Sequence, residues 1–317
     1  TNLVELFNHP NVWQRRMAQR VLQQRLSARR GRGGPTEPGV HPALLNTLDG
    51  KKSLEASLAA FWTMQAYGSG VPRWIYWSES VVVPEMWLRK WMAAWHIIAL
   101  EDYSAEAIST LEKLAADADP RVRLAVATAV RRFVAGALTV NDGVYTEAPV
   151  GGVLAALIKS SADAKDPLLP YMIWHASEPL LAHNPQPGLD WLAENGPATL
   201  PLSGILTRKA MRRICDTRDA AKLNLAMDFL ARIADSSAEL TTAALDGLLE
   251  GQKGQAFLPT VDSSALLNKL AASANSTIVE RTRQLGALWG EAGAIQQMFA
   301  MVNDRNAGLN ERAKAIQ

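Results

Sequence analysis

The chain has 317 residues, of which 48% are hydrophobic and 20% charged, so it can bury a substantial core and is not intrinsically disordered. Its 33 Lys and Arg residues against 31 Asp and Glu give a formal net charge of +2, which does not indicate the clustered basic surface that nucleic-acid binding needs. The single cysteine, Cys215, excludes an internal disulfide, a Cys-based zinc site and Cys-x-x-Cys-His haem attachment.

One pattern returns about every 35–45 residues: a short turn, then a segment containing arginines whose apolar residues have helical spacing. The clearest copy is 117–133 (DADPRVRLAVATAVRRF), and looser copies are 9–22 (HPNVWQRRMAQRVL) and 83–95 (VPEMWLRKWMAAW). A repeat of this length built from helix pairs predicts a stacked α-solenoid, in which each unit buries its apolar face against its neighbours. Strand signals are almost absent. We therefore predict an all-α superhelix of HEAT or armadillo-like repeats, a single solenoid over residues 1–317.

Helix pairs are predicted along the whole chain, and an Asp before a Pro in the first turn supports the helix starts at Pro120 and Pro167. Segments 27–39, 68–84 and 139–152 are expected to be loops, because they are rich in Gly, Pro or turn residues, or irregular. Such insertions often lie on the binding face of a solenoid. The predicted pairs are 2–8 with 10–27, 41–48 with 51–67, 72–82 (irregular) with 84–101, 104–117 with 119–135, 150–162 with 167–183, 186–195 with 199–215, 218–234 with 237–250, 262–273 with 276–290, and 291–302 with 306 onward.

Tryptophans form a stripe along the helix predicted at 84–101, where Trp87, Trp91 and Trp95 recur every four residues. Such a stripe could stack on bases or sugars, or could dock a partner. The alternative, which we favour, is that these side chains fill the seam between neighbouring helix pairs, as aromatic residues at helical spacing usually do. Further tryptophans nearby in the sequence are Trp62, Trp74 and Trp77.

Segment 166–179 (DPLLPYMIWHASEP) has an unusual composition for a helix and contains Trp174, His175 and Glu178. His175 and Glu178 are three residues apart and share a helix face, so they could hydrogen-bond or bind a metal together. One His and one Glu are too few for a metal site, and we favour a structural hydrogen bond, with partner binding as the alternative. Pro179 has no N–H for the carbonyl of His175, which predicts a free carbonyl and a kink.

Basic residues recur on the second helix of several predicted pairs. If these helices line the concave face, the charges could grip an acidic partner. The alternative, which we favour, is intramolecular pairing, as with Arg123 beside the turn at Asp117 and Asp119, because Arg suits partly buried bidentate contacts. The residues concerned are Arg15, Arg16, Arg20, Arg89, Lys90, Arg121, Arg123, Arg212 and Arg213.

Two isolated residues are weaker candidates for chemistry. His96 is expected to be buried and hydrogen-bonded. Cys215 is close in sequence to several arginines, which could lower the pKa of its thiol. The sequence has no Ser nucleophile elbow, phosphate-binding Gly loop or HExxH motif, so we predict no catalytic, cofactor-binding or metal-binding residue.

Three segments resemble the HEAT-repeat region of large bacterial PVC-type haem-binding proteins. Residues 3–25 (LVELFNHPNVWQRRMAQRVLQQR) are similar to the opening of that region, and 87–91 (WLRKW) and 166–179 resemble two later patterns, with His175 where the family often has a second aromatic. In that family a sugar-dehydrogenase-like β-propeller precedes the HEAT repeats and a c-type cytochrome domain follows them. The resemblance implies a periplasmic or secreted multidomain parent in which this region is a spacer between the two.

We predict a non-catalytic scaffold or protein-interaction module without cofactors, whose partners are proteins or neighbouring domains of the same polypeptide. Because both ends fall in helical patterns, we expect a fragment of a longer chain, and no membrane span is expected. Two alternatives stay open: a HEAT-like DNA glycosylase of the alkylpurine type, disfavoured by the near-zero net charge, and peptide or sugar binding through the Trp-rich loop at 68–84. The candidate interaction surface comprises Arg15, Arg16, Trp74, Trp77, Arg89, Trp91, Arg123, Trp174, His175 and Glu178.

Overall fold

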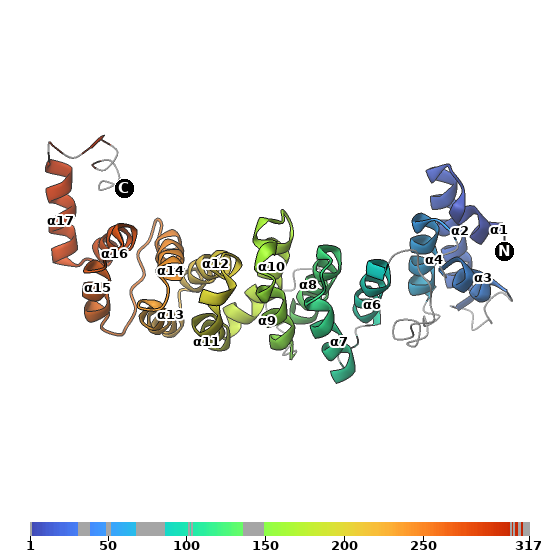
Figure 1. Cartoon of the computed structure of the whole chain (residues 1–317), viewed down its shortest axis with the longest axis horizontal. Helices are drawn as coiled ribbons and strands as arrows, with labels where there is room; N and C mark the ends of the chain where they lie inside the picture. Colours follow the sequence, from blue (N-terminus) through green and yellow to red (C-terminus); the bar gives the residue numbers. More distant parts are fainter. Residues whose placement is uncertain are drawn as a thin grey trace. The chain divides into compact units, whose positions relative to one another are not determined.

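The computed structural model describes residues 2–30, 39–48, 52–67, 86–100, 102, 104–135, 149–304, 306, 308, 309 and 312. Within these ranges every regular element is a helix (Figure 1). The α-helices are α1 (Asn2–Glu5), α2 (Val12–Arg30), α3 (Val40–Leu48), α4 (Leu54–Tyr67), α6 (Met86–Leu100), α7 (Ala105–Ala115), α8 (Pro120–Ala135), α9 (Gly151–Lys159), α10 (Leu169–His183), α11 (Gln186–Asn195), α12 (Leu202–Asp216), α13 (Ala220–Ile233), α14 (Ala238–Gly251), α15 (Ser264–Ala271), α16 (Ser276–Leu288) and α17 (Ala292–Asn303).

The chain is an all-α repeat solenoid, and the predicted helix pairs are confirmed where the structure describes them. Their ends differ from the prediction by a few residues. The helix expected at 150–162 ends at Lys159 and is followed by a 3-10 segment, Ser161–Lys165. A second 3-10 segment, Gly196–Thr199, precedes α12. The helix expected at 72–82 lies outside the described residues. No described helix is both long enough and apolar enough to span a bilayer.

The chain divides into two compact units, residues 1–129 and 130–317. Unit 1 has its own hydrophobic core, formed by α1 to α4 and α6 around Phe7, Phe61 and Leu88, all fully buried. Tryptophans from two helices close one side of that core. Trp62 meets Trp91 and Trp95 edge to face, with ring centroids 5.8 and 5.3 Å apart.

The predicted packing role of the tryptophan stripe is therefore confirmed for the residues on α6. Trp91 and Trp95 lie against the core of unit 1, where edge-to-face geometry adds to the burial of their surface. Trp87 also packs against this core, and the guanidinium of Arg121 lies 3.5 Å from the centre of its ring. His96 is buried, as predicted, and its Nδ1 lies 2.9 Å from Nε2 of Gln65.

Unit 2 is built as two layers of helices. Helices α10, α12, α14 and α16 lie side by side in one layer, and α9, α11, α13 and α15 form the other (Figure 1). Several helices of this unit start at side chains that accept hydrogen bonds from first-turn amides: Asp219 for α13, Ser237 for α14 and Asn275 for α16. The core between the layers contains Phe229, Leu230 and Leu245, which are essentially inaccessible to solvent.

The contact between α12 and α14 is closer than the others because α14 presents two glycines, Gly247 and Gly251, one turn apart. A Cβ at Gly247 would lie 2.7 Å from Cβ of Met211 and would collide with the carbonyl oxygen of Arg208. A Cβ at Gly251 would collide with the side chain of Cys215. The missing side chains let the two helix backbones approach each other.

Candidate functional site

Two ion pairs that join neighbouring helices of the first layer of unit 2 have the same separation along the sequence. Nε of Arg213 on α12 donates to Glu178 on α10 at 2.5 Å, and Nε of Arg281 on α16 donates to Asp246 on α14 at 2.7 Å. In both pairs the two residues are 35 positions apart. Helices α12 and α14 run parallel, because Gly247 faces Met211 and Gly251, one turn later, faces Cys215. One repeat of this layer is therefore about 35 residues long.

Further ion pairs join charged side chains on neighbouring helices. Arg208 pairs with Glu250 of α14, and this hydrogen bond lowers the pKa of the Glu250 carboxyl. Arg232 of α13 pairs with Asp190 of α11, whose carboxyl has a lowered pKa because it accepts hydrogen bonds from Gln186 and Arg232. These carboxylates are thus held in their charged form by contacts within the chain.

The intramolecular interpretation of the basic residues is confirmed at several positions. Nη1 of the buried Arg123 donates to the carbonyl of Asp117 at 2.5 Å, and Lys90 pairs with the carboxylate of the same residue. Nη1 of Arg15 donates to the carbonyl of His9 at 2.8 Å. Such contacts tie the start of a helix to the turn that precedes it or to its neighbour.

The residues of the predicted candidate surface differ in burial and in role. Arg16 is exposed and Arg89 is half-buried, whereas Arg123 and Trp91 serve packing in unit 1. Trp74 and Trp77, and with them the loop at 68–84, lie outside the described residues. In unit 2, α10 carries Trp174, His175 and Glu178.

The hydrogen bond predicted between His175 and Glu178 is replaced by an interhelical one. The described hydrogen bond of the Glu178 carboxylate comes from Arg213 on α12, and His175 is exposed. The guanidinium offers a charge-assisted contact, which is stronger than one from a neutral imidazole. Sequence spacing along α10 could not reveal this partner, because it lies one repeat away.

An exposed aromatic and cationic surface lies across α10 and α12. Nζ of Lys209 is 5.0 Å from the ring centre of Tyr171 and 5.8 Å from that of Trp174, so one ammonium faces two rings. Tyr171 is 58% exposed, a large fraction for an aromatic residue of this size. We call this surface the α10–α12 stripe; it comprises Tyr171, Trp174, His175, Lys209 and Arg212.

Sequence reasoning found Trp174, His175 and Arg212 but missed Tyr171 and Lys209. A signal was present, since Tyr171 precedes Trp174 by one helical turn and Lys209 follows Trp174 by one 35-residue repeat. Among the described ion pairs of unit 2, none uses Lys209 or Arg212. The stripe thus presents Lys209 beside the exposed ring of Tyr171 and the half-buried ring of Trp174, with the exposed Arg212 one turn further along α12.

The expectation of a lowered pKa for Cys215 is wrong. The thiol is buried in the contact between α12 and α14, and burial raises its pKa to about 11, with a further contribution from the charge of Asp216. The nearby Arg218 acts in the opposite direction but is outweighed. In the ranges that the structure describes, no three His, Cys, Asp or Glu side chains gather closely enough to hold a metal ion.

No known protein family model matches the chain, and no curated protein matches it. Among solved structures, the chain is similar to a designed armadillo repeat protein at 19% sequence identity. The match covers 90% of this chain and 98% of the designed protein, with a TM-score of 0.28. Because this score is low, the assignment to the class of all-α repeat solenoids rests on the helix pairs and their stacking.

Proposed function

We propose that this chain is a scaffold module that docks a protein partner through the α10–α12 stripe. The observation that carries the proposal is the placement of Lys209 against the rings of Tyr171 and Trp174 on an exposed helix surface. Aromatic side chains and arginine dominate the binding energy of protein interfaces. A repeat solenoid supports such a surface well, because helices held in register keep the side chains at fixed distances.

The charge of the stripe favours an acidic partner. Lys209 and Arg212 lie one turn apart on α12, whereas neighbouring arginines such as Arg208 and Arg213 are already paired with carboxylates of this chain. Cations at an interface accelerate association with a complementary surface and disfavour a basic one. We therefore expect an acidic patch on the partner.

The partners we propose are neighbouring domains of the same polypeptide: a dehydrogenase-like propeller and a c-type cytochrome domain, separated by this module as a spacer. The support is the resemblance of residues 3–25, 87–91 and 166–179 to the HEAT-repeat region of PVC-type haem-binding proteins. On this proposal the parent protein is periplasmic or secreted. Redox chemistry then belongs to the flanking domains, and this module sets their separation and orientation.

The experiment has two steps. The reading frame that encodes this chain is first determined, and a propeller before it with a haem-binding motif after it is the expected arrangement. The flanking domains are then produced separately and titrated with this chain by calorimetry. Lys209→Glu and Tyr171→Ala are each expected to weaken binding at least about tenfold, as truncation of interface hot spots does.

Lys159→Glu is the matched control, because Lys159 is an exposed lysine on α9, in the other layer, and enters none of the described ion pairs. Equal affinity for the original chain and the Lys209→Glu and Tyr171→Ala variants would refute the stripe as the docking surface. Redox turnover by the isolated chain would refute the scaffold role. DNA glycosylase chemistry predicts salt-dependent binding of duplex DNA, which the internal pairing of Arg208, Arg213 and Arg281 disfavours.

A further inference from the structure

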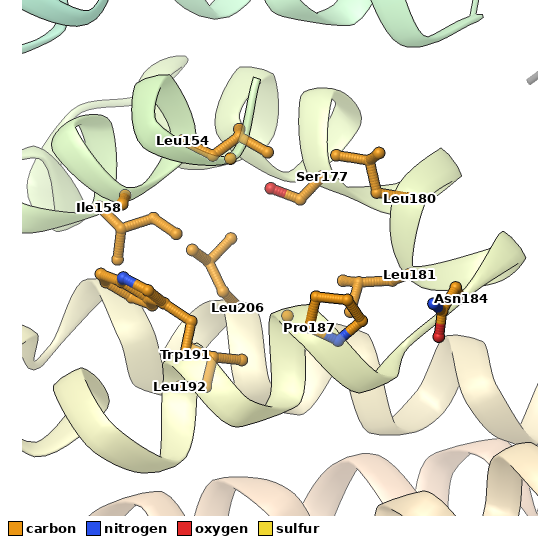
Figure 2. Close-up of a pocket in the computed structure, with 13 residues that line it drawn as sticks. Leu154, Ile158, Ser177, Leu180, Leu181, Asn184, Pro187, Trp191, Leu192 and Leu206 are labelled. Atoms are coloured by element: carbon orange, nitrogen blue, oxygen red, sulfur yellow. The ribbon is translucent and has the colours of Figure 1, made fainter. Parts of the chain in front are cut away.

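A cavity of about 390 Å³ lies within unit 2, between the α9–α10 pair and the α11–α12 pair (Figure 2). Leu154 and Ile158 of α9 form one wall, and Trp191 of α11 and Leu206 of α12 lie opposite. The cavity is not the docking stripe described above. It lies in the seam between two repeats and is partly open to solvent, since Gly151, Asn184 and Pro187 in its lining are exposed.

Small residues explain why this seam is hollow. In the same layer α11 packs against α13, but where α9 would meet α11 the cavity intervenes. The lining includes Gly151 and Ala155 on α9 and Pro187 on α11, which carry no long side chains, and a Cβ at Gly151 would meet nothing within 4 Å. The larger residues around them therefore lack contact partners on the cavity side, and a bound apolar molecule would restore those contacts.

The walls are apolar apart from one end. The hydroxyl of Ser177 lines the cavity but already donates to the carbonyl of Ile173 at 2.8 Å. Figure 2 shows Asn184 at one end of the cavity, away from Trp191 and Ile158. A ligand with an apolar body and a single polar end matches this arrangement.

A cation is bound to the last turn of α10, next to the polar end but outside the cavity lining. Nζ of Lys222, on α13, donates to the carbonyl of Ala182, which is next to Leu181 in the cavity wall and two residues before Asn184. An ammonium at this position attracts an anionic head group and disfavours a cationic one. A carboxylate is the simplest group of that kind.

The volume sets the length of the apolar body. An apolar protein cavity of about 150 Å³ holds one benzene, so about 390 Å³ has room for roughly fifteen carbon atoms. The aliphatic walls of Leu154, Leu181 and Leu206 suit a flexible chain. We infer that this cavity binds an unbranched fatty acid of about 10–14 carbons, with its carboxylate at the Asn184 end.

The test is a calorimetric titration of the full chain with dodecanoate below its micellar concentration. We expect saturable binding of one molecule per chain, weakened about tenfold for every two methylenes removed from the ligand. Ala155→Phe places a ring in part of the cavity and is expected to weaken dodecanoate binding at least about tenfold, whereas Ala156→Phe, on the same helix but outside the lining, keeps it. Absence of binding to the original chain, or unchanged binding to Ala155→Phe, would overturn the inference.

Two further variants keep the test decisive. If Ala155→Phe does not fold, as judged by circular dichroism, Gly151→Leu occupies part of the same cavity from a position whose Cβ would meet nothing within 4 Å. Lys222→Glu is expected to weaken dodecanoate binding several-fold and to leave dodecanol binding unchanged. Equal weakening of dodecanoate and dodecanol binding would show that the carboxylate does not lie at the Asn184 end of the cavity. Because binding is measured without any protein partner, its failure leaves the docking proposal untouched.

Discussion

Individual residues decide how closely the repeats of unit 2 can stack, and Gly247 is the clearest case. Its missing side chain faces the backbone of α12 at Arg208, which cannot rotate away as a flexible side chain can. A methyl group there has to push the two helices apart. This separation also weakens the packing of the core residues beneath the two helices, because protein interiors are closely packed.

Gly247→Ala is expected to lower the free energy of unfolding of unit 2 by about 2–3 kcal/mol, a typical cost of overpacking. Urea denaturation followed by circular dichroism measures the change. Gly293→Ala is the matched control, because a Cβ at this position in α17 meets nothing within 4 Å. Its effect is expected to be neutral or stabilising by up to about 1 kcal/mol. Equal stability of Gly247→Ala and the original chain would contradict the close approach of α12 and α14.

Cys215 gives stability that depends on pH. Its pKa in the folded state is about 11, above the ordinary value of 9.0, so the folded state holds the proton more tightly than the unfolded state does. This contribution is complete below pH 9 and is lost as pH rises towards 11. Between pH 8 and 10 the loss from this thiol amounts to about 1.4 kcal/mol.

The measurement is the unfolding free energy of the original chain and of Cys215→Ala at pH 8, 9 and 10. The difference between the two proteins is expected to shrink as pH rises, because only the original chain has the thiol. In the native state a thiol reagent should react slowly at pH 8, since the thiol is buried and protonated. A constant difference across this range would refute the raised pKa.

Single helices depend on short local signals at their ends. α16 begins after Asn275, whose Oδ1 accepts hydrogen bonds from the amides of Thr277 at 3.0 Å and Ile278 at 3.3 Å. Two amides without helical partners are satisfied in this way. The same device starts α13 at Asp219 and α14 at Ser237.

Asn275→Ala is expected to destabilise unit 2 by about 1 kcal/mol, because these amides lose their acceptor. Ser276→Ala provides the control, since Ser276 is exposed at the first position of the same helix and is not its cap. Thermal unfolding by calorimetry compares the two. A cap role is refuted if both variants melt at the temperature of the original chain.

At the scale of the whole molecule, each compact unit carries its own hydrophobic core. The core of residues 1–129 is formed by α1 to α4 and α6, and the large core of residues 130–317 is formed by α11 to α16. In repeat proteins, stability is approximately a sum of terms for each repeat and its immediate neighbours. A substitution that destabilises one core is therefore expected to leave the stability of the other core unchanged.

Phe229→Ala tests this expectation. The side chain is 1% exposed in the core of unit 2, and its removal is expected to cost about 3–5 kcal/mol. Hydrogen exchange followed by mass spectrometry should show faster exchange in α12, α13 and α14. Protection of α2 and α4 in unit 1 should not change. Equally faster exchange in both units would show that the chain unfolds as one cooperative body.

The helices and their pairing could be predicted from the sequence, because the relevant signals act over one or two turns. Apolar residues at helical spacing, Asp before Pro120 and polar caps all work within a few residues. The packing role of Trp91 was predictable for the same reason, as was the use of Arg123 at its own turn.

Only the tertiary structure decided which residues meet across repeats. The partner of Glu178 is Arg213, the rings beside Lys209 belong to α10, and the hollow between α9 and α11 is lined by four helices. The thiol of Cys215 is protonated because α14 covers it, although arginines surround it in sequence. Each of these features joins segments about one repeat apart, and their distance depends on how two helix pairs stack. Local periodicity contains no information about that stacking.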